Sequence, residues 1–282
     1  MHYFLYTTGR KDVMKAKKVL FITTEIEPFV TENEHSLKGR LLPQSIQELG
    51  HEIRTFSPKW GSINERRNQL HEVIRLSGMN LIIDDTDHPL IIKVASLPSA
   101  KMQVYFIDND DYFMKRGMLT DKEGKEYSDN GERAIFYARG VLETVKKLGW
   151  NPDVIHCYGW AAALAPFYIK QAYYDEPSFR DVKVVMEISP KEFENDLGAD
   201  NAQKMEYKDA LYADIQDICE QAYGHNELEK IGVKFADGII IENKDVDPSI
   251  IEYAKSLGKP VLDPVEGDSF NEAYSKFYES LF

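Results

Sequence analysis

The stretch from Lys17 to Pro58, "KKVLFITTEIEPFVTENEHSLKGRLLPQSIQELGHEIRTFSP", decides the fold. Its apolar run Val19–Thr23 predicts a buried strand, and Ile53–Phe56 predicts a second one. Between them, apolar residues recur at helical spacing and stop before Gly50, a residue type suited to the position just after a helix. These apolar residues are Leu41, Leu42, Ile46 and Leu49. Strand, helix and strand in this order predict a βαβ unit with a right-handed crossover.

The rest of the chain continues this alternation of strands and helices. Four further short runs are rich in β-branched residues and nearly continuous, which is typical of strands that are covered on both faces. They are Val104–Ile107, Val154–Cys157, Val184–Ile188 and Ile239–Ile241. We therefore predict an α/β fold over residues 15–282, a single doubly wound Rossmann-like parallel sheet with an added β-hairpin. We expect residues 1–14 to be an N-terminal extension.

Two local features of this fold have clear sequence signals. The segment "NLIIDDTDHPLIIKVASL" (Asn80–Leu97) places two apolar strands around a polar stretch, which predicts a hairpin with its turn from Asp84 to Pro89. The segment "SDNGERAIFYARGVLETVKKLGW" (Ser128–Trp150) predicts a long helix. Asp129 and Glu132 have the spacing of a capping box at its start.

Composition and charge exclude several classes of partner. The chain has 282 residues, 43% of them apolar, and a formal net charge of −13. Nucleic acids and anionic membrane surfaces attract lysine and arginine patches, so we expect neither as a partner. Cys157 and Cys219 stand far apart, which fits a reducing compartment rather than a disulfide framework. No apolar run has the length of a membrane span, and we predict a cytoplasmic protein.

The hairpin turn is the one candidate for a metal site. Asp84, Asp85, Asp87 and His88 have the ligand chemistry of a Ca²⁺ or Mg²⁺ site. The same residue types are also common in turns, because Asp side chains bond to nearby backbone groups. Such metal sites need about six organised oxygen donors, so we favour the turn and predict no metal site.

The segment "DVIHCYGWAAALAP" (Asp153–Pro166) predicts a ligand-binding edge. A buried strand runs through His156 to Tyr158 and is followed by Gly159 and Trp160. The carboxyl ends of parallel strands are where α/β folds bind ligands. Trp160 would either stack against a sugar or base there, or pack against the first turn of the following helix; both alternatives are open.

Taken together, these segments resemble the N-terminal, starch synthase catalytic-type domain of the bacterial glycogen synthase and plant starch synthase family. The resemblance covers about residues 17–243. "EIEPFVTENEHSLKGRLLP" matches the family's E-x-x-P-F-x-K-T-G-G-L-x-D-V and L-P without a gap, and "DVIHCYGW" resembles D-V-V-H-x-H-D-W-H. "LGHEIRTFSPKW", "VYFIDNDDYF", "YSDNGERAIFY" and "KIGVKFADGIIIEN" resemble further family segments in the same order.

The resemblance implies the N-terminal half of a GT-B enzyme of glycosyltransferase family 5. Such enzymes join two Rossmann-like domains and transfer glucose from ADP-glucose to an α-1,4-glucan without an essential metal. The N-terminal half mainly holds the acceptor and the reacting glucose. The resemblance implies weak sugar binding by a set of residues at the strand ends and in the long helix. They are His156, Tyr158, Trp160, Asp129 and Arg133.

The departures from the family pattern point to impaired catalysis. Thr31 stands where the family has its donor-contacting lysine, and Asn33 and Glu34 replace the two glycines that lie against the diphosphate. Leu37 replaces the motif's aspartate, and Ala161 replaces the active-site histidine. We also expect the second Rossmann domain, with its phosphate-binding basic residues and catalytic glutamate, to be absent.

The sequence therefore predicts a glycogen synthase-like protein of α-1,4-glucan metabolism that is catalytically impaired on its own. We expect no cofactor, and as partners an α-1,4-glucan or a separate protein that supplies the C-terminal GT-B half. Two alternatives remain open. The chain is the acceptor half of a split ADP-glucose-dependent glucosyltransferase, or it is a non-enzymatic interaction or regulatory domain.

Overall fold

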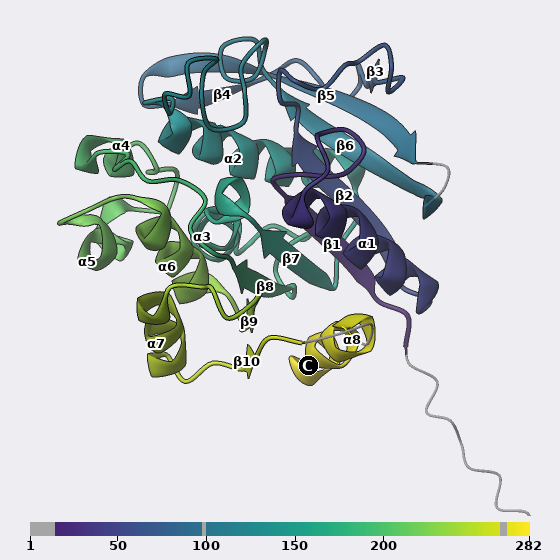
Figure 1. The fold of residues 1–282 in the computed structure, drawn as a ribbon, viewed down its shortest axis with the longest axis vertical. Coiled ribbons are helices and arrows are strands. Elements are labelled where there is room, and N and C mark those ends of the chain that lie inside the picture. The colour runs from purple at the N-terminus through teal and green to yellow at the C-terminus, as the bar shows by residue number, and fades with distance from the viewer. Residues whose placement is uncertain (1–14, 98–99, 266–269) are drawn as a thin grey trace, which may run out of the picture.

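A mostly parallel sheet forms the centre of the molecule. The computed structural model describes residues 15–97, 100–265 and 270–282, so the expected extension, residues 1–14, lies outside the described residues. Within these ranges ten strands form one sheet in the order β10-β9-β8-β7-β1-β2-β6-β5-β3, with β4 paired to β5 (Figure 1). The parallel strands are β1 (Lys18–Thr23), β2 (Glu52–Pro58), β6 (Met102–Asp108), β7 (Val154–Tyr158), β8 (Lys183–Ile188), β9 (Gly238–Ile241) and β10 (Val261–Leu262). All six predicted parallel strands are confirmed.

Antiparallel strands extend one edge of the sheet. β5 (Thr86–Leu97) pairs with β6, with β4 (Met79–Ile83) and with β3 (His71–Glu72). The hairpin is confirmed, but its turn is shorter than predicted. Asp84 adopts a positive φ of 56°, and Pro89 belongs to β5 opposite Asn80. Proline is tolerated there because β5 begins to pair with β6 only at Ile91, so no ladder bond is lost.

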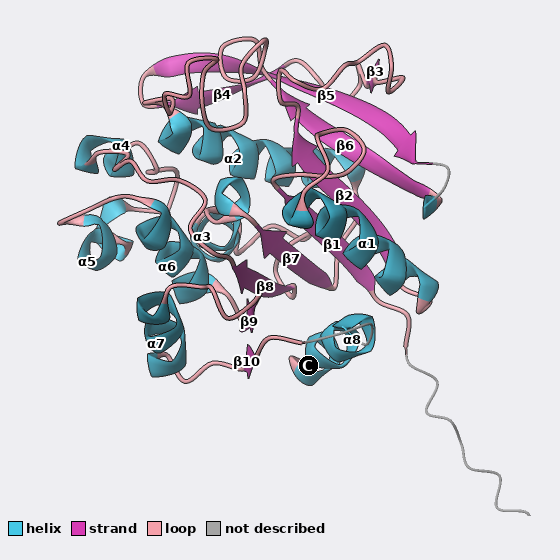
Figure 2. Cartoon of the chain, viewed as in Figure 1, coloured by secondary structure: helices cyan, strands magenta, loops and turns pink. Residues whose placement is uncertain are grey.

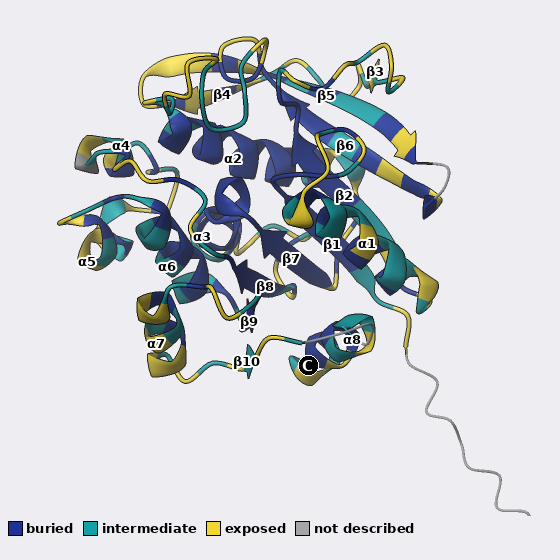
Figure 3. Ribbon diagram, viewed as in Figure 1, coloured by how far each residue is buried: buried dark blue, intermediate teal, exposed yellow. Residues whose placement is uncertain are grey.

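Helices cover both faces of the sheet (Figures 1 and 2). α1 (Glu34–Glu48) and α8 (Phe270–Ser280) pack on one face. The other face carries α2 (Asn130–Leu148), α3 (Ala165–Gln171), α6 (His225–Phe235) and α7 (Pro248–Ser256). Short helical turns complete the described chain: η2 (Trp160–Ala162), α4 (Ala199–Gln203), η3 (Tyr212–Asp214) and α5 (Gln216–Cys219). Figure 3 shows the central strands buried between these layers. None of these helices combines the length and the apolar character that crossing a bilayer requires.

The long helix α2 ends as predicted but does not begin as predicted. Gly149 closes it in the left-handed conformation with a φ of 60°. Asp129 precedes it but makes no side-chain capping bond. Its carboxylate instead accepts two hydrogen bonds from Arg116, at 2.7 and 2.5 Å. The capping-box prediction is therefore wrong, because a bidentate arginine offers this carboxylate a charged partner.

The two ends of the described chain lie close together. The ammonium group of Lys17 lies 3.5 Å from the centroid of the Phe282 ring, a cation–π contact. Lys17 precedes β1 and Phe282 follows α8, so the start of the central strand and the last helix are neighbours at one end of the sheet.

Gly39 lets α1 approach the loop that follows β1. A Cβ atom at this position would lie 2.1 Å from the backbone oxygen of Glu25, far inside van der Waals contact. The Glu25 carbonyl belongs to backbone and has little freedom to move away. The absence of a side chain at Gly39 therefore sets how closely α1 packs on the sheet.

We predict that Gly39→Ala lowers the free energy of unfolding by about 1–3 kcal/mol, the usual cost of overpacking. The matched control is Gly131→Ala in α2, where an added Cβ would have its nearest neighbour at 3.5 Å. That substitution should be neutral, or stabilising by up to about 1 kcal/mol, because alanine is the better helix former. Urea unfolding of both variants is the measurement, and equal stability would contradict the close-approach argument.

Candidate functional site

The sequence candidates lie along the edge where β1, β7, β8 and β9 end. Side chains alternate along β7, so His156 and Tyr158 point toward the face covered by α1 and α8. Trp160 lies in η2 and packs with the core of the opposite face. The structure therefore divides these three residues between the two sides of the sheet.

The loop before α1 is closed by its own side chains. The Asn33 Oδ1 atom accepts the backbone N–H of Ser36 at 2.7 Å, and the Ser36 hydroxyl accepts the backbone N–H of Asn33 at 2.9 Å. The Asn33 amide also donates to Glu25 Oε2 at 2.7 Å. Burial raises the pKa of Glu25, and the hydrogen bond from Asn33 offsets part of that shift. The loop thus uses backbone donors that an anion would otherwise bind at a helix N-terminus.

Thr31 and Glu34 are both exposed. Glu34 opens α1, where a carboxylate is favoured by the helix dipole. It also lines an open pocket of ≈ 310 Å³ with Lys38 and Glu242. The remaining lining residues are Leu37, Leu41, Val265, Phe270 and Tyr274. Any anion that entered this pocket would meet carboxylates as well as the ammonium group of Lys38.

A buried carboxylate, that of Glu187, lies at the centre of the α1–α8 side. His156 Nε2 lies 2.9 Å from Glu187 Oε2, and the Tyr274 hydroxyl donates to Oε1 at 2.7 Å. Lys38 forms an ion pair with the same Oε1 atom. Burial alone would raise the pKa of Glu187, but Lys38 and His156 outweigh burial and lower this pKa to about 2. His156 is therefore committed on both ring nitrogens, since Nδ1 lies 2.7 Å from the Tyr278 hydroxyl.

Tyr158 belongs to an adjoining network. Its hydroxyl donates to Glu242 Oε1 at 2.7 Å and lies 2.8 Å from His35 Nδ1. The rings of Tyr158 and His35 are stacked, with centroids 5.2 Å apart. Only 4% of Tyr158 is exposed, so the ring is not an open platform in this structure.

Trp160 and Arg133 belong to a buried stack on the other side. The rings of Trp160 and Trp60 are stacked at 6.0 Å, and the Arg133 guanidinium lies 4.8 Å from the Trp60 ring. Arg133 donates to the carbonyl oxygens of Gly117 and Met118 at 2.8 and 2.7 Å. Trp160 has no exposed surface. The geometry of Trp160 corresponds to the packing alternative. Sugar contact by Trp160, Arg133 and Asp129, which is held by Arg116, stays a prediction.

Ala161 lies in a sharp turn at the end of β7. Gly159 before it has a φ of 83°, and a Cβ there would lie 2.4 Å from Thr24 Oγ1. The Ala161 N–H donates to the same hydroxyl at 3.3 Å. The turn brings the ends of β1 and β7 together, but at Ala161 it presents a methyl group, which can neither transfer a proton nor bind an anion.

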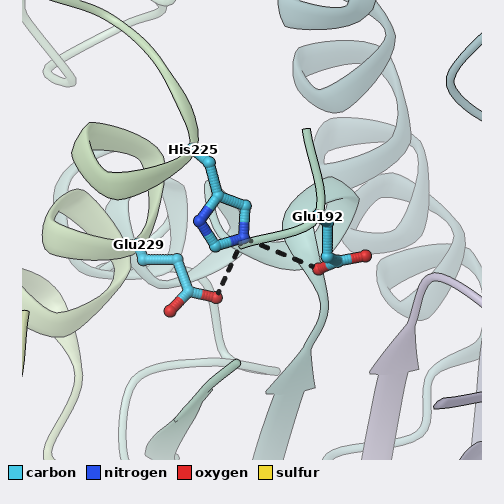
Figure 4. A group of neighbouring side chains, drawn as sticks. All are labelled: Glu192, His225 and Glu229. Carbon is cyan, nitrogen blue, oxygen red and sulfur yellow. Dashed lines mark ion pairs between the residues drawn. The ribbon is translucent and has the colours of Figure 1, made fainter. Parts of the chain in front are cut away.

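Potential metal ligands gather at a place that the sequence did not indicate. In the described ranges, one group of three converges: Glu192, His225 and Glu229 (Figure 4). The hairpin aspartates do not take part, and His88 instead lies 2.9 Å from the Thr86 hydroxyl and 3.0 Å from that of Tyr112.

Sequence reasoning also missed the residues that organise this edge. Glu187 and Glu242 sit in the apolar segments "KVVMEI" and "GIIIEN", and Lys38 sits in α1. A signal was present. A carboxylate inside or directly after a fully buried strand is costly unless it is paired, so it indicates a partner brought from elsewhere in the fold.

We predict that Lys38→Met lowers the free energy of unfolding at pH 7 by about 3–5 kcal/mol, because it takes the lysine ammonium group away from the buried, charged Glu187. The pKa of Glu187 falls on folding from its ordinary value of 4.5 to about 2. Its stabilisation is therefore complete above pH 4.5 and is lost as the pH falls toward 2. In the variant Glu187 protonates at a higher pH, so the difference from wild type should shrink as the pH falls.

Urea unfolding at pH 7 and at pH 4 measures this effect. The double variant Lys38→Met/Glu187→Gln should regain more than half of the lost stability, since no charge is left buried. Lys276→Met, in the exposed part of α8, is the control and should be close to neutral. Equal losses in the single and double variants would show that the ion pair is not what holds α1.

Comparison with known proteins agrees with this geometry. The starch synthase catalytic domain profile matches residues 18–251. The glycogen synthase of Chlorobium limicola is 33% identical over 274 residues, covering 94% of this chain and 56% of its own length. The glycogen synthase of Chlorobium luteolum is 41% identical over 172 residues, which cover 61% of this chain and 35% of that enzyme. The chain spans about half the length of the curated relatives it matches.

A solved structure supports the fold independently. The catalytic domain of starch synthase IV from Arabidopsis thaliana, bound to ADP and acarbose, superposes with a TM-score of 0.73 at 14% identity. The match covers 92% of this chain and 53% of that one. The GT-B half-fold expected from the sequence is thereby confirmed. With the starch synthase catalytic domain profile matching most of its length and a glycogen synthase matching 94% of it, the chain belongs to the glycogen and starch synthase family.

Proposed function

We propose that this chain is a glycogen synthase-like protein of α-1,4-glucan metabolism that does not by itself transfer glucose from ADP-glucose. The observation that carries the proposal is the closed N-terminus of α1. Asn33 and Ser36 satisfy each other's backbone N–H groups there, at 2.7 and 2.9 Å. A nucleotide diphosphate at this turn needs those donors free and needs a backbone without side chains for close approach.

Charge adds to this effect. Glu34 and Glu25 place carboxylates beside the loop, and Thr31 offers a hydroxyl in place of a cation. Two like charges at ~4 Å repel by about 4 kcal/mol at an effective dielectric constant of about 20. Lys38 is already paired with Glu187 and lies 3.5 Å from Glu242, and Arg40 is paired with Glu27. The missing imidazole at Ala161 removes a further group from the reacting centre.

We predict no incorporation of labelled glucose from ADP-glucose into glycogen above a no-enzyme blank. The Chlorobium limicola glycogen synthase, assayed alongside, is the positive control. Asn33→Gly/Glu34→Gly should also be inactive, because groups that act as a unit are not additive and a single restored group recovers little. Incorporation by the unmodified chain alone would refute the proposal.

Weak glucan binding at the strand ends is part of the proposal, with Tyr158 and Trp160 as sugar contacts. Both are buried, so binding must displace part of their packing, which costs affinity. Isothermal titration with maltooligosaccharides should give a Kd no better than about 1 mM, near −4 kcal/mol. Tyr158→Ala and Trp160→Ala, checked for folding by circular dichroism, should abolish the signal. Binding that both variants retain would place the glucan elsewhere.

A second candidate function is the acceptor half of a split glucosyltransferase. It starts from the family match, in which 94% of this chain aligns with 56% of the Chlorobium limicola enzyme. The segment of that enzyme beyond the match, expressed separately, is the natural test partner. A stoichiometric complex that incorporates glucose would support the split enzyme. A complex without activity would support the interaction domain instead.

A further inference from the structure

Three ligand-type side chains converge beside the carboxyl end of β8 (Figure 4). Glu192 lies in the loop after β8, His225 is the first residue of α6, and Glu229 follows one helical turn later. The His225 Nε2 atom lies 3.9 Å from Glu192 Oε1 and 3.9 Å from Glu229 Oε1. One ligand atom from each residue lies within 4.8 Å of the other two. Residues four apart on a helix share a face, so α6 aims both of its side chains at Glu192.

His225 is buried without a hydrogen bond. Its side chain has no exposed surface, and neither ring nitrogen has a hydrogen-bond partner among the described residues. Phe193 contacts the ring edge-on, with centroids 5.5 Å apart. A buried polar group without a partner costs about 1–3 kcal/mol, so an imidazole held in this way indicates a ligand between it and the two carboxylates.

The two carboxylates also lack a fixed cation. In residues 15–97, 100–265 and 270–282, neither Glu192 nor Glu229 forms an ion pair with a lysine or arginine. The geometry therefore leaves both carboxylates available to a bound cation.

The carboxylates are oriented by neighbouring donors. Glu229 accepts the Ser189 hydroxyl at 2.9 Å and the Ser189 backbone N–H at 3.1 and 3.2 Å. Glu192 Oε1 accepts the backbone N–H of Trp160 at 2.8 Å and lies 3.2 Å from the Ser189 hydroxyl oxygen. Donors of this kind are the usual supports of metal ligands, because they fix the carboxylate without neutralising it.

We propose that Glu192, His225 and Glu229 bind a divalent first-row transition-metal cation, with Zn²⁺ as the representative ion. One imidazole with two carboxylates suits this class, whereas Mg²⁺ and Ca²⁺ prefer oxygen ligands alone. At Zn–ligand distances of about 2.0–2.2 Å, tetrahedral ligands lie roughly 3.4 Å apart, so the two 3.9 Å separations need to shorten by only about half an ångström.

Three protein ligands leave a fourth position for water, and Glu192, with 9% of its side chain exposed, is the least buried of the three ligands. The ion would join the loop after β8 to the start of α6, next to the Gly159 turn. Binding does not depend on glucose transfer, so this site and the proposed function stand or fall separately.

Tag-free, chelator-treated protein gives the test. Zn²⁺ titrated by calorimetry should bind at one ion per chain. Co²⁺ should give visible absorption bands of a protein-bound ion, and Mg²⁺ at the same concentration should not compete. Failure of both Zn²⁺ and Co²⁺ to bind would overturn the proposal.

Two variants assign the binding. Glu229→Gln keeps the shape and the Ser189 contacts, and His225→Phe replaces the imidazole by a ring; each should weaken Zn²⁺ binding at least 100-fold and abolish the Co²⁺ bands. His71→Gln, at an exposed histidine of β3, is the matched control and should bind as the wild type does. If Glu229→Gln, which needs no repacking, binds Zn²⁺ unchanged, the site is not the one proposed.

Discussion

The carboxylate of Glu187 is the constraint on which this edge of the protein depends. It has no exposed surface, and its partners come from three separate elements: Lys38 from α1, His156 from β7 and Tyr274 from α8. A buried charge is tolerated only with such partners, so the elements that supply them are held in one arrangement. The position of α1, in turn, fixes where the loop before it can lie.

The charge of the strand ends follows from that arrangement. Two cations of α1 are already engaged: Lys38 pairs with Glu187, and Arg40 pairs with Glu27. What remains at the edge is acidic: burial raises the pKa of Glu25, and the nearby carboxylate of Glu192 adds to this shift. An edge of this kind repels a diphosphate and attracts a metal cation. The acidic edge bears on both proposals in the same direction, although each is tested separately.

Much of the fold could be predicted from the sequence because it is recorded in local patterns. The run Val19–Thr23 and the five other predicted parallel strands are continuous apolar segments, which is the pattern of strands covered on both faces. Gly149 ends α2 because glycine adopts the left-handed conformation without strain. The prediction for Asp129 was wrong because its partner, Arg116, is not in the helix it was expected to cap. The predicted hairpin turn, from Asp84 to Pro89, was too long because polar residues occur in strands as well as in turns.

The site was harder to predict for the same reason. Trp160 could be placed at a strand end, but whether its face is open depends on Trp60 and Phe193, which lie far away in the sequence. The convergence of Glu192 with His225 depends on a loop and a helix that meet only in the folded chain. Pairing between distant polar residues leaves little trace in any one segment, whereas apolar periodicity leaves a clear one.

The contact between Lys17 and Phe282 has a consequence for how the chain can be connected. Because these residues touch, a short linker would join them without crossing the sheet or disturbing α8. New ends would then fit at the exposed turn of Asp84 and Asp85, where the backbone already reverses direction. A circularly permuted form of residues 17–282 would therefore keep the described strand pairings, with its new ends at the hairpin turn.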